Sequence, residues 1–266
     1  MDEQQHRDAR VALTAALVEA LVALWQSLGS WHRPDVERFL RDALPLVRAH
    51  QRTLADVTAQ RVAQRASDVL RVDVPVPVVP DEAAVDLRYD VDEAEVYERP
   101  FHDLWFALQE GDDLEAAVKR GADRLQGIAE MDMQQTHSES TRAAQRALPK
   151  RSRPRWWERT LEGEENCLLC IVASTRPYFV GDLNPLHPGC DCEIREHWTA
   201  PPDVVDEERL ADAYGQAAEA GYEGTSAEHL RDIIAGHGEV GPTLIDPAAR
   251  KREARAKKRA EQARTN

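Results

Sequence analysis

Residues 166–170 read Asn-Cys-Leu-Leu-Cys, and residues 186–192 read Leu-His-Pro-Gly-Cys-Asp-Cys. These two stretches hold all four cysteines of the 266-residue chain. Structural zinc takes four ligands in a tetrahedral arrangement and binds thiolate sulfur and imidazole nitrogen readily. A CxxC pair presents two thiolates from one tight turn, and a CxC pair presents two from an extended segment. We therefore predict that the segment between the first and last cysteine folds back to bind one structural zinc ion.

The pattern offers one ligand more than zinc needs. A site closed by four protein ligands leaves no open position for water, so the ion would organise the fold and would not hydrolyse a substrate. It would also stabilise a loop that has little apolar content of its own. Four of the following five residues are expected to bind it: Cys167, Cys170, His187, Cys190 and Cys192.

Two other uses of the cysteines stay open. In an oxidising compartment an even number of cysteines would form disulfides. Residues 1–6 are polar and are not followed by a cleavable signal peptide pattern, which disfavours that reading. A CxxC redox pair expects a thioredoxin-like βαβ context and gives no role to Cys190 or Cys192.

The composition is that of a helix-rich chain with few large core residues. Hydrophobic residues make up 42%, aromatic residues 6% and charged residues 31%. The formal net charge of −14 argues against a body that coats DNA, because phosphate binding needs a basic face. No segment carries the roughly 20 consecutive apolar residues of a membrane span.

Two long amphipathic helices are predicted in the N-terminal half. Leucines recur at steps of three and four within residues 8–28, which marks one apolar helix face, and Gly29 ends this helix. A second helix spans about residues 34–70, with Pro34 in its first turn. Pro45 lies inside it and should kink the helix or split it in two.

A proline-rich strap and an acidic connector follow. Residues 72–80, VDVPVPVVP, cannot be helical, because three prolines at this density impose an extended, polyproline-like backbone. Residues 81–98 carry eight acidic side chains against Arg88 alone, which is typical of a solvated segment. We therefore place a boundary here, with residues 1–80 as a helical N-terminal region.

Two further helices are expected before the cysteines. Residues 100–110, PFHDLWFALQE, indicate a short, aromatic-rich helix that stops at Gly111. Asp112 or Asp113 then caps a long helix that reaches about Leu148.

The second half of this long helix is polar and holds His137, Ser138 and Glu139. Neighbouring residues on a helix point about 100° apart, so these three cannot form a catalytic relay among themselves. We expect them at the surface. The chain also lacks a GxSxG nucleophile motif, and we therefore predict that it is not an enzyme.

A basic segment at residues 150–155 leads into the cysteine region, and Trp156-Trp157 follow it. Tryptophans beside arginines can stack on bases, but they more often bury against a small core. Residues 193–198 alternate like a strand, with which residues 159–161 are expected to pair. The predicted fold is mainly α, with a small zinc-stapled α+β module at about residues 155–200.

The C-terminal part is polar. Within residues 201–246 we expect two short helices, at about 204–220 and 226–235, and residues 247–266 form a basic tail that is disordered or a lone helix. Such a tail is either solvated or docks on nucleic acid or an acidic protein face. The candidate nucleic-acid contacts are Arg151, Arg153, Arg155, Lys257, Lys258 and Arg259.

The two cysteine stretches also carry a resemblance. Residues 166–170 followed by residues 186–192 resemble the carboxy-terminal motif of the MuF-like minor head proteins of tailed bacteriophages, a family that commonly ends its domain in a His-Pro-x-Cys-x-Cys signature. Residues 97–101, YERPF, followed by a helix, a glycine and a long helix, are similar as well. The resemblance covers about residues 95–198, and it implies a MuF-like domain at residues 99–200. The segment between the cysteine pairs is short, so some peripheral strands of the family fold are expected to be absent.

This resemblance implies a structural protein of the virion, present in few copies inside the capsid near the portal and assembled in the host cytoplasm. Its expected role is head morphogenesis, its expected partners are the portal protein and other head proteins, and no small-molecule substrate is implied. The basic tail offers a contact with packaged DNA. Two alternatives remain: a capsid maturation protease or a protease-fused relative, and a DNA-binding zinc module that aids packaging or ejection.

Overall fold

The computed structural model describes residues 2–85, 87, 91–161, 177–179, 193–199, 234–237 and 241–244, together with residues 174, 208, 211 and 215. The five cysteine-region ligand candidates and the basic tail lie outside the described residues. Contacts divide the chain into two units, and the five α-helices of the described residues belong to the first, which takes in residues 1–155. The prediction of a mainly helical chain with long N-terminal helices is confirmed.

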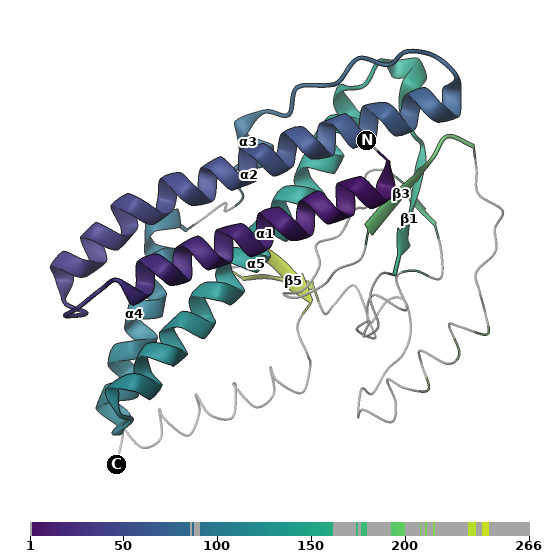
Figure 1. The fold of residues 1–266 in the computed structure, drawn as a ribbon. Coiled ribbons are helices and arrows are strands. Elements are labelled where there is room, and N and C mark those ends of the chain that lie inside the picture. The colour runs from purple at the N-terminus through teal and green to yellow at the C-terminus, as the bar shows by residue number, and fades with distance from the viewer. Residues whose placement is uncertain are drawn as a thin grey trace. The chain divides into compact units, whose positions relative to one another are not determined.

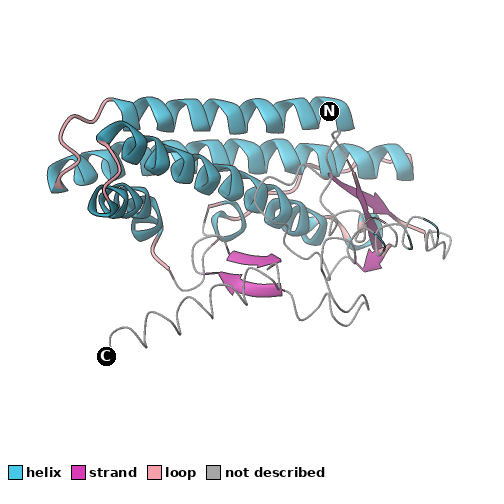
Figure 2. Cartoon of the chain, turned by 90° about the horizontal axis from the view of Figure 1, so that it is seen from below, coloured by secondary structure: helices cyan, strands magenta, loops and turns pink. Residues whose placement is uncertain are grey.

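The first unit is built around its last helix. α1 and α2 lie side by side and run in opposite directions (Figures 1 and 2). α5 packs against α1, α2, α3 and α4, so it is the element that every other helix of the unit contacts. The helices are α1 (Glu3–Gln26), α2 (Arg33–Leu70), α3 (Asp81–Ala84), α4 (Glu93–Glu110) and α5 (Leu114–Ala147).

Both N-terminal helices differ in detail from the prediction. α1 begins at Glu3, before the expected start at residue 8, because Asp2 and Gln5 form a capping box in which each side chain accepts the other's backbone N–H. The helix predicted at about residues 34–70 is confirmed as α2, which runs through Pro45, so of the two expected effects of this proline, a kink or a split, the split does not occur. Pro45 is exposed, and the carbonyl it leaves without a helical partner can bind water.

The acidic stretch at residues 81–98 lies within this unit. It contains α3 and the first turns of α4, which starts at Glu93 and not at the expected residue 100. Arginines of α2 meet its charges: Arg52 Nη2 lies 2.9 Å from Asp81 Oδ2, and Arg48 Nη2 lies 2.8 Å from Glu93 Oε2. These ion pairs join the acidic stretch to α2, and no pattern in the local sequence indicates this contact.

The boundary between α4 and α5 follows the sequence prediction. Gly111 ends α4 with φ of 100°, a backbone conformation that glycine adopts without steric cost. The carboxylate of Asp113 then accepts the N–H of Ala116 at 2.8 Å and caps α5. The two helices therefore form a hairpin whose turn is fixed by two adjacent local signals.

An aromatic cluster holds α1, α2 and α4 together. The Trp25 ring centroid lies 4.7 Å from that of Phe101 and 5.9 Å from that of Phe39, and the two phenylalanine rings are 5.5 Å apart. All three side chains are buried. Trp25 also donates its indole N–H to the carbonyl of Val118 in α5 at 3.1 Å, so the ring joins four helices.

α5 accommodates this ring because residue 121 has no side chain. A Cβ placed on Gly121 would overlap the Trp25 ring and lie 2.9 Å from the carbonyl oxygen of Pro100. Gly127, on the same helix, has no atom within 4 Å of the corresponding position. The close approach of α1 and α4 to α5 therefore depends on Gly121.

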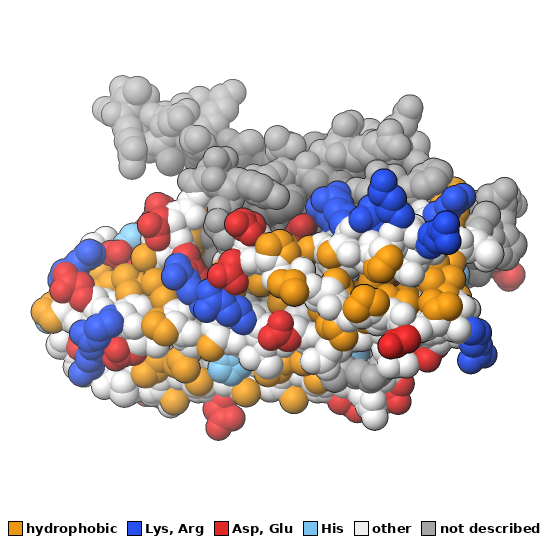
Figure 3. Space-filling model, turned by 90° about the horizontal axis from the view of Figure 1, so that it is seen from above, with side chains coloured by type: hydrophobic (Ala, Val, Ile, Leu, Met, Phe, Trp, Pro, Cys, Tyr) orange, Lys and Arg blue, Asp and Glu red, His pale blue; other side chains and the backbone are white. Residues whose placement is uncertain are grey.

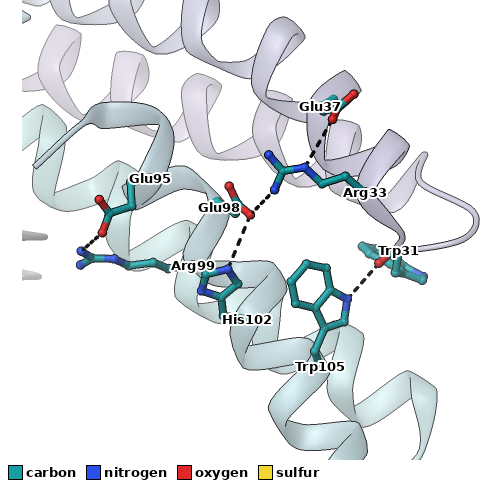
Figure 4. Close-up of polar contacts among 8 residues, drawn as sticks. All are labelled: Trp31, Arg33, Glu37, Glu95, Glu98, Arg99, His102 and Trp105. Atoms are coloured by element: carbon teal, nitrogen blue, oxygen red, sulfur yellow. Dashed lines mark hydrogen bonds and ion pairs between the residues drawn. The ribbon is translucent and has the colours of Figure 1, made fainter.

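A polar seam joins the start of α2 to α4 (Figure 4). Arg33 Nη1 lies 2.6 Å from Glu98 Oε1, and the indole N–H of Trp105 donates to the carbonyl of Trp31 at 2.9 Å. The other contacts drawn there join Arg33 to Glu37, Glu98 to His102 and Glu95 to Arg99. This seam fixes the α1–α2 turn against α4.

The α1–α2 turn places Trp31 at φ of 58°, which is unusual for a residue with a side chain. One carboxylate oxygen of Asp35 accepts three hydrogen bonds there, from the N–H and hydroxyl of Ser30 at 2.8 Å each and from the N–H of Trp31 at 3.0 Å. These bonds, with the Ser30 N–H as the largest cause, lower the pKa of Asp35 from 3.8 to about 2. The charged carboxylate therefore holds the turn in place.

The second unit contains a three-stranded antiparallel sheet in the order β2-β1-β3, and the strands are drawn in magenta in Figure 2. The predicted pairing of the strand after the last cysteine is confirmed for Arg159 and Thr160 by β1 and β3, and the ladder ends before Leu161. A separate two-stranded sheet joins β4 and β5. Residues 234–235 are therefore strand and not the end of the helix expected at 226–235. The strands are β1 (Trp156–Thr160), β2 (Tyr178–Phe179), β3 (Glu193–His197), β4 (Ile234–His237) and β5 (Gly241–Leu244).

The close approach at Gly121 can be tested with a matched pair of substitutions in α5. We expect Gly121→Ala to lower the free energy of unfolding by about 1–3 kcal/mol, because the added methyl group must displace the Trp25 ring or the α4 backbone. Gly127→Ala should instead raise it by about 0.5–1 kcal/mol, since alanine loses less backbone entropy in a helix. Urea unfolding followed by circular dichroism measures both. Equal effects of the two substitutions would contradict the proposed packing.

The Asp35 contacts predict a pH dependence. Because the pKa of Asp35 is lower in the folded chain, the carboxylate stabilises the fold above about pH 4, and this contribution is lost as the pH falls toward 2. Asp35→Ala should therefore be less stable than the parent chain at neutral pH, with the difference shrinking over that acidic range. Asp42→Ala, which removes an exposed carboxylate of the same helix, is the control and should leave the profile unchanged. Urea unfolding at a series of pH values measures the difference.

Candidate metal centre

The β1–β3 ladder brackets the cysteine-bearing segment. The two strands pair from Trp156 with His197 to Thr160 with Glu193. Paired residues of an antiparallel ladder have Cα atoms about 4.5–5.5 Å apart. Residues 161–192, which contain every cysteine of the chain, therefore start and end at neighbouring points.

This closure favours metal binding in physical terms. Bringing two distant ligand pairs together costs chain entropy, and part of that cost is already met when the ends of the segment are hydrogen-bonded. Cys192 directly precedes Glu193, so the CxC pair adjoins the end of the ladder. The donor set of thiolates and one imidazole suits zinc. Because all five candidate ligands lie outside the described residues, the zinc site and its ligand set stay predictions.

The ladder itself is held by side chains on both of its faces. Trp157 is 1% exposed, and the Arg159 guanidinium carbon lies 5.7 Å from the centroid of its ring. Glu158 Oε1 lies 3.5 Å from Arg195 Nη1 and 3.3 Å from His197 Nε2 on the opposite strand. With its ring buried, Trp157 is not available to stack on a base, and the interpretation of this residue as core is confirmed.

The arginines proposed to contact nucleic acid lie in the segment after α5. Arg151, Arg153 and Arg155 are all exposed. Arg153 donates from Nε to the carbonyl of Leu148 at 2.8 Å, and it thereby satisfies a carbonyl at the C-terminal end of the helix. Residues 257–259, the other candidates, lie outside the described residues.

The YERPF stretch at residues 97–101 has a structural role at several of its positions. The hydroxyl of Tyr97 donates to Asp132 Oδ2 at 2.8 Å, and both side chains are buried. Glu98 carries the ion pairs of the seam in Figure 4, and Phe101 lies in the aromatic cluster. This stretch therefore anchors α4 to α2 and to α5.

The polar second half of α5 is buried, which contradicts the expectation that His137 and Ser138 lie at the surface. α3 supplies part of the cover: Thr136 donates from its hydroxyl to the carbonyl of Ala84 at 2.9 Å, and Ser140 donates to Ala83 at 3.3 Å. The hydroxyl groups thus satisfy carbonyls of a one-turn helix. Pro80, directly before residues 81–84, is the sequence signal for α3, and the prediction of an acidic connector at residues 81–98 did not include this helix.

Three residues from three helices meet in this buried region. His6 Nε2 of α1 lies 3.3 Å from the hydroxyl oxygen of Thr58 in α2, and the His6 ring centroid lies 5.1 Å from that of His137 in α5. None of the three side chains is more than 1% exposed. Sequence reasoning missed this group because its members are far apart in the chain and no local motif marks them.

No family model, curated protein or solved structure matches this chain. The resemblance to the MuF-like proteins therefore rests on the motif residues themselves. None of the described helices combines the length and the apolar character needed to cross a membrane.

The Tyr97–Asp132 contact predicts a measurable loss of stability. Tyr97→Phe removes the hydroxyl that donates to a buried carboxylate, and we expect the free energy of unfolding to fall by about 1–3 kcal/mol. Asp132→Asn weakens the same bond from the other side, so the double variant should cost less than the sum of the two single ones. Strictly additive losses in urea unfolding would show that the two groups do not interact.

Proposed function

We propose that this chain is a structural minor head protein of a tailed bacteriophage, associated with the portal inside the capsid and stabilised by one zinc ion in the cysteine segment. The proposal rests on the order of features along residues 97–192. The YERPF stretch in α4, the glycine stop, the long helix α5 and the β1 strand are followed by the CxxC and HPxCxC elements. Apart from the β1 strand, this order is the one that carries the family resemblance.

The closure of the cysteine segment by flanking strands supports the zinc part of the proposal. Its ends pair through Thr160 and Glu193, and all candidate ligands lie between them. A metal bound there would cross-link a small module that must stay folded through assembly. With four protein ligands it would have no position for a substrate or an attacking water, which favours a structural role.

The helical unit suits a protein that works by contact with partner proteins. On the face shown in Figure 3, apolar side chains lie between charged side chains of both signs, and several Lys and Arg side chains gather at one edge. DNA coating needs a basic field over a whole face, and the net charge of −14 opposes it. Long helices such as α1 and α2 offer extended surfaces for a portal or head partner.

A protease role is less well supported. A serine nucleophile needs a base within hydrogen-bond reach and access to the substrate. His137 and Ser138 are neighbours on one helix, and both are buried. A non-catalytic role is therefore the better proposal.

A DNA-binding zinc module is the second candidate, because Arg151, Arg153 and Arg155 are exposed and directly precede β1 in the chain. Its affinity for DNA should fall steeply with salt, and replacing all three arginines by alanine should reduce the slope of log affinity against log salt. Portal binding that is insensitive to salt, with no measurable DNA affinity, would favour the head-protein role.

The zinc prediction can be checked by metal analysis of the purified full chain. We expect one zinc per chain, lost in Cys170→Ser and in Cys190→Ser and retained in Ser174→Ala, a control between the two cysteine pairs. His187→Ala shows whether the imidazole is a ligand. If all four cysteines react with an alkylating reagent in the absence of a chelator, the zinc site is ruled out. It is also ruled out if the cysteines form disulfides.

The partner is tested separately, by co-purification with the portal protein of the same phage. We expect the parent chain to bind the portal. A chain that lacks residues 156–266 shows whether the helical unit is sufficient for this binding. Absence of the protein from purified virions would overturn the proposed function, whatever the metal content.

A further inference from the structure

We propose that the proline-rich strap, residues 72–80, is a docking segment whose partner is a protein with an aromatic-lined groove that binds polyproline II chain. This inference goes beyond the proposed function and depends on neither the zinc site nor the portal. It rests on the backbone form that the sequence imposes, on the two contacts that hold the strap along α2, and on the exposed side chains of the strap.

The sequence leaves the strap little conformational freedom. Prolines at positions 75, 77 and 80 fix φ at about −65°, and each disfavours the helical region for the residue before it. Within residues 74–80, Val78 is the one position that is neither a proline nor followed by one. Pro80 has φ of −71° and ψ of 155°, close to the polyproline II values of about −75° and about 145°. The strap is therefore preformed for a partner that binds this backbone.

Two contacts with α2 hold the strap extended. The N–H of Val74 donates to Ser67 Oγ at 3.0 Å, and Asp81, directly after the strap, forms an ion pair with Arg52. The stretch of α2 from residue 52 to residue 67 is about 22 Å long at a rise of about 1.5 Å per residue. The chain from residue 74 to residue 81 also spans about 22 Å if it is polyproline II, with a rise of about 3.1 Å. The strap therefore runs back along α2 with little slack (Figure 1).

The three-residue period of polyproline II separates the strap into rows of side chains, since every third residue returns to the same face. The row of residues 72, 75 and 78 is exposed at each position, and the side chain of Val78 is 85% exposed. In the row that starts at Val74, this residue is buried and Pro77 is half-buried. The strap thus turns one row toward the protein and presents another as an apolar ridge. A continuous apolar ridge of this kind marks an interaction site more often than a single exposed valine does.

The missing N–H groups favour a groove over the edge of a sheet as the partner surface. An extended segment can also join a sheet as an added strand, through its backbone N–H and C=O groups. On an extended chain these groups point to opposite sides at alternate residues, and the N–H of Val74 points to α2. The outer edge then belongs to residues 73, 75, 77 and 79, two of which are prolines without an N–H. Apolar contacts in an aromatic-lined groove need no such donors.

The charges beside the ridge indicate the rim of the groove. Asp73 and Glu82 are exposed near the two ends of the strap, and Arg71 is an exposed cation next to Val72. Because the carboxylates outnumber the cation, a groove with a basic rim complements the strap. We therefore expect the partner to combine aromatic side chains in the groove with Lys or Arg at its edge.

The test is photo-crosslinking of the full chain in the cells that produce it. The amino acid p-benzoylphenylalanine replaces Val76, which is 54% exposed, and mass spectrometry identifies the linked residues. We expect links to one protein, at or beside aromatic residues that line a groove. Pro75→Ala with Pro77→Ala should lower the yield roughly 4- to 30-fold, because each alanine restores backbone freedom that binding must remove. Val78→Asp should abolish the link.

Val11 of α1, a valine that is 57% exposed, supplies the matched controls. The same crosslinking amino acid at position 11 should not link to this partner, and Val11→Asp should leave the link from position 76 unchanged. Circular dichroism of each variant checks that the helices are retained. The inference is overturned if position 76 gives no link, or gives the same links as position 11. It is also overturned if the linked surface has no aromatic residues, or if the folded double-alanine variant links as well as the parent chain.

Discussion

The Trp25 ring can lie against the backbone of α5 only because residue 121 carries no side chain. This contact brings three helices to the distance at which Phe39 and Phe101 can pack on the ring, and it lets the indole N–H reach the Val118 carbonyl. Aromatic residues are only 6% of the chain, so a few large rings have to fill the space between long helices. This crowded point therefore sets how closely α1 and α4 approach α5 within the apolar core of the unit.

Away from that point, the core of the helical unit becomes polar. The second half of α5 replaces large apolar side chains with amides, hydroxyls and imidazoles, which must find partners because a buried polar group without a hydrogen bond costs free energy. Three hydroxyl groups show how the chain does this: Tyr97 of α4 donates to Asp132 of α5, and Thr136 and Ser140 of α5 donate to carbonyls of α3. Such directional bonds favour one register of α5 against its neighbouring helices. Apolar packing alone specifies that register less strictly.

Local signals in the sequence predicted the elements that local physics decides. Gly111, Asp113 and the strand after Cys192 were found because a glycine stop, a capping carboxylate and period-two alternation each act within a few residues. The start of α1 had a local signal too, the Asp2–Gln5 capping box, which apolar periodicity did not show. The burial of His137 could not be read in this way, since its neighbours come from residues more than fifty positions away. For the cysteine segment, the sequence predicted the flanking strands, and the ligand set stays a prediction.

The pairing of Thr160 with Glu193 also bears on how such a module can vary. Because a hydrogen-bonded ladder joins the two ends of the intervening segment, extra residues inserted there need not disturb the strands that carry it. Each doubling of a flexible loop adds only about 0.6 kcal/mol of closure entropy. Homologous chains could thus gain or lose whole hairpins at this place while keeping the same frame, which makes it the natural point for lineages to diversify.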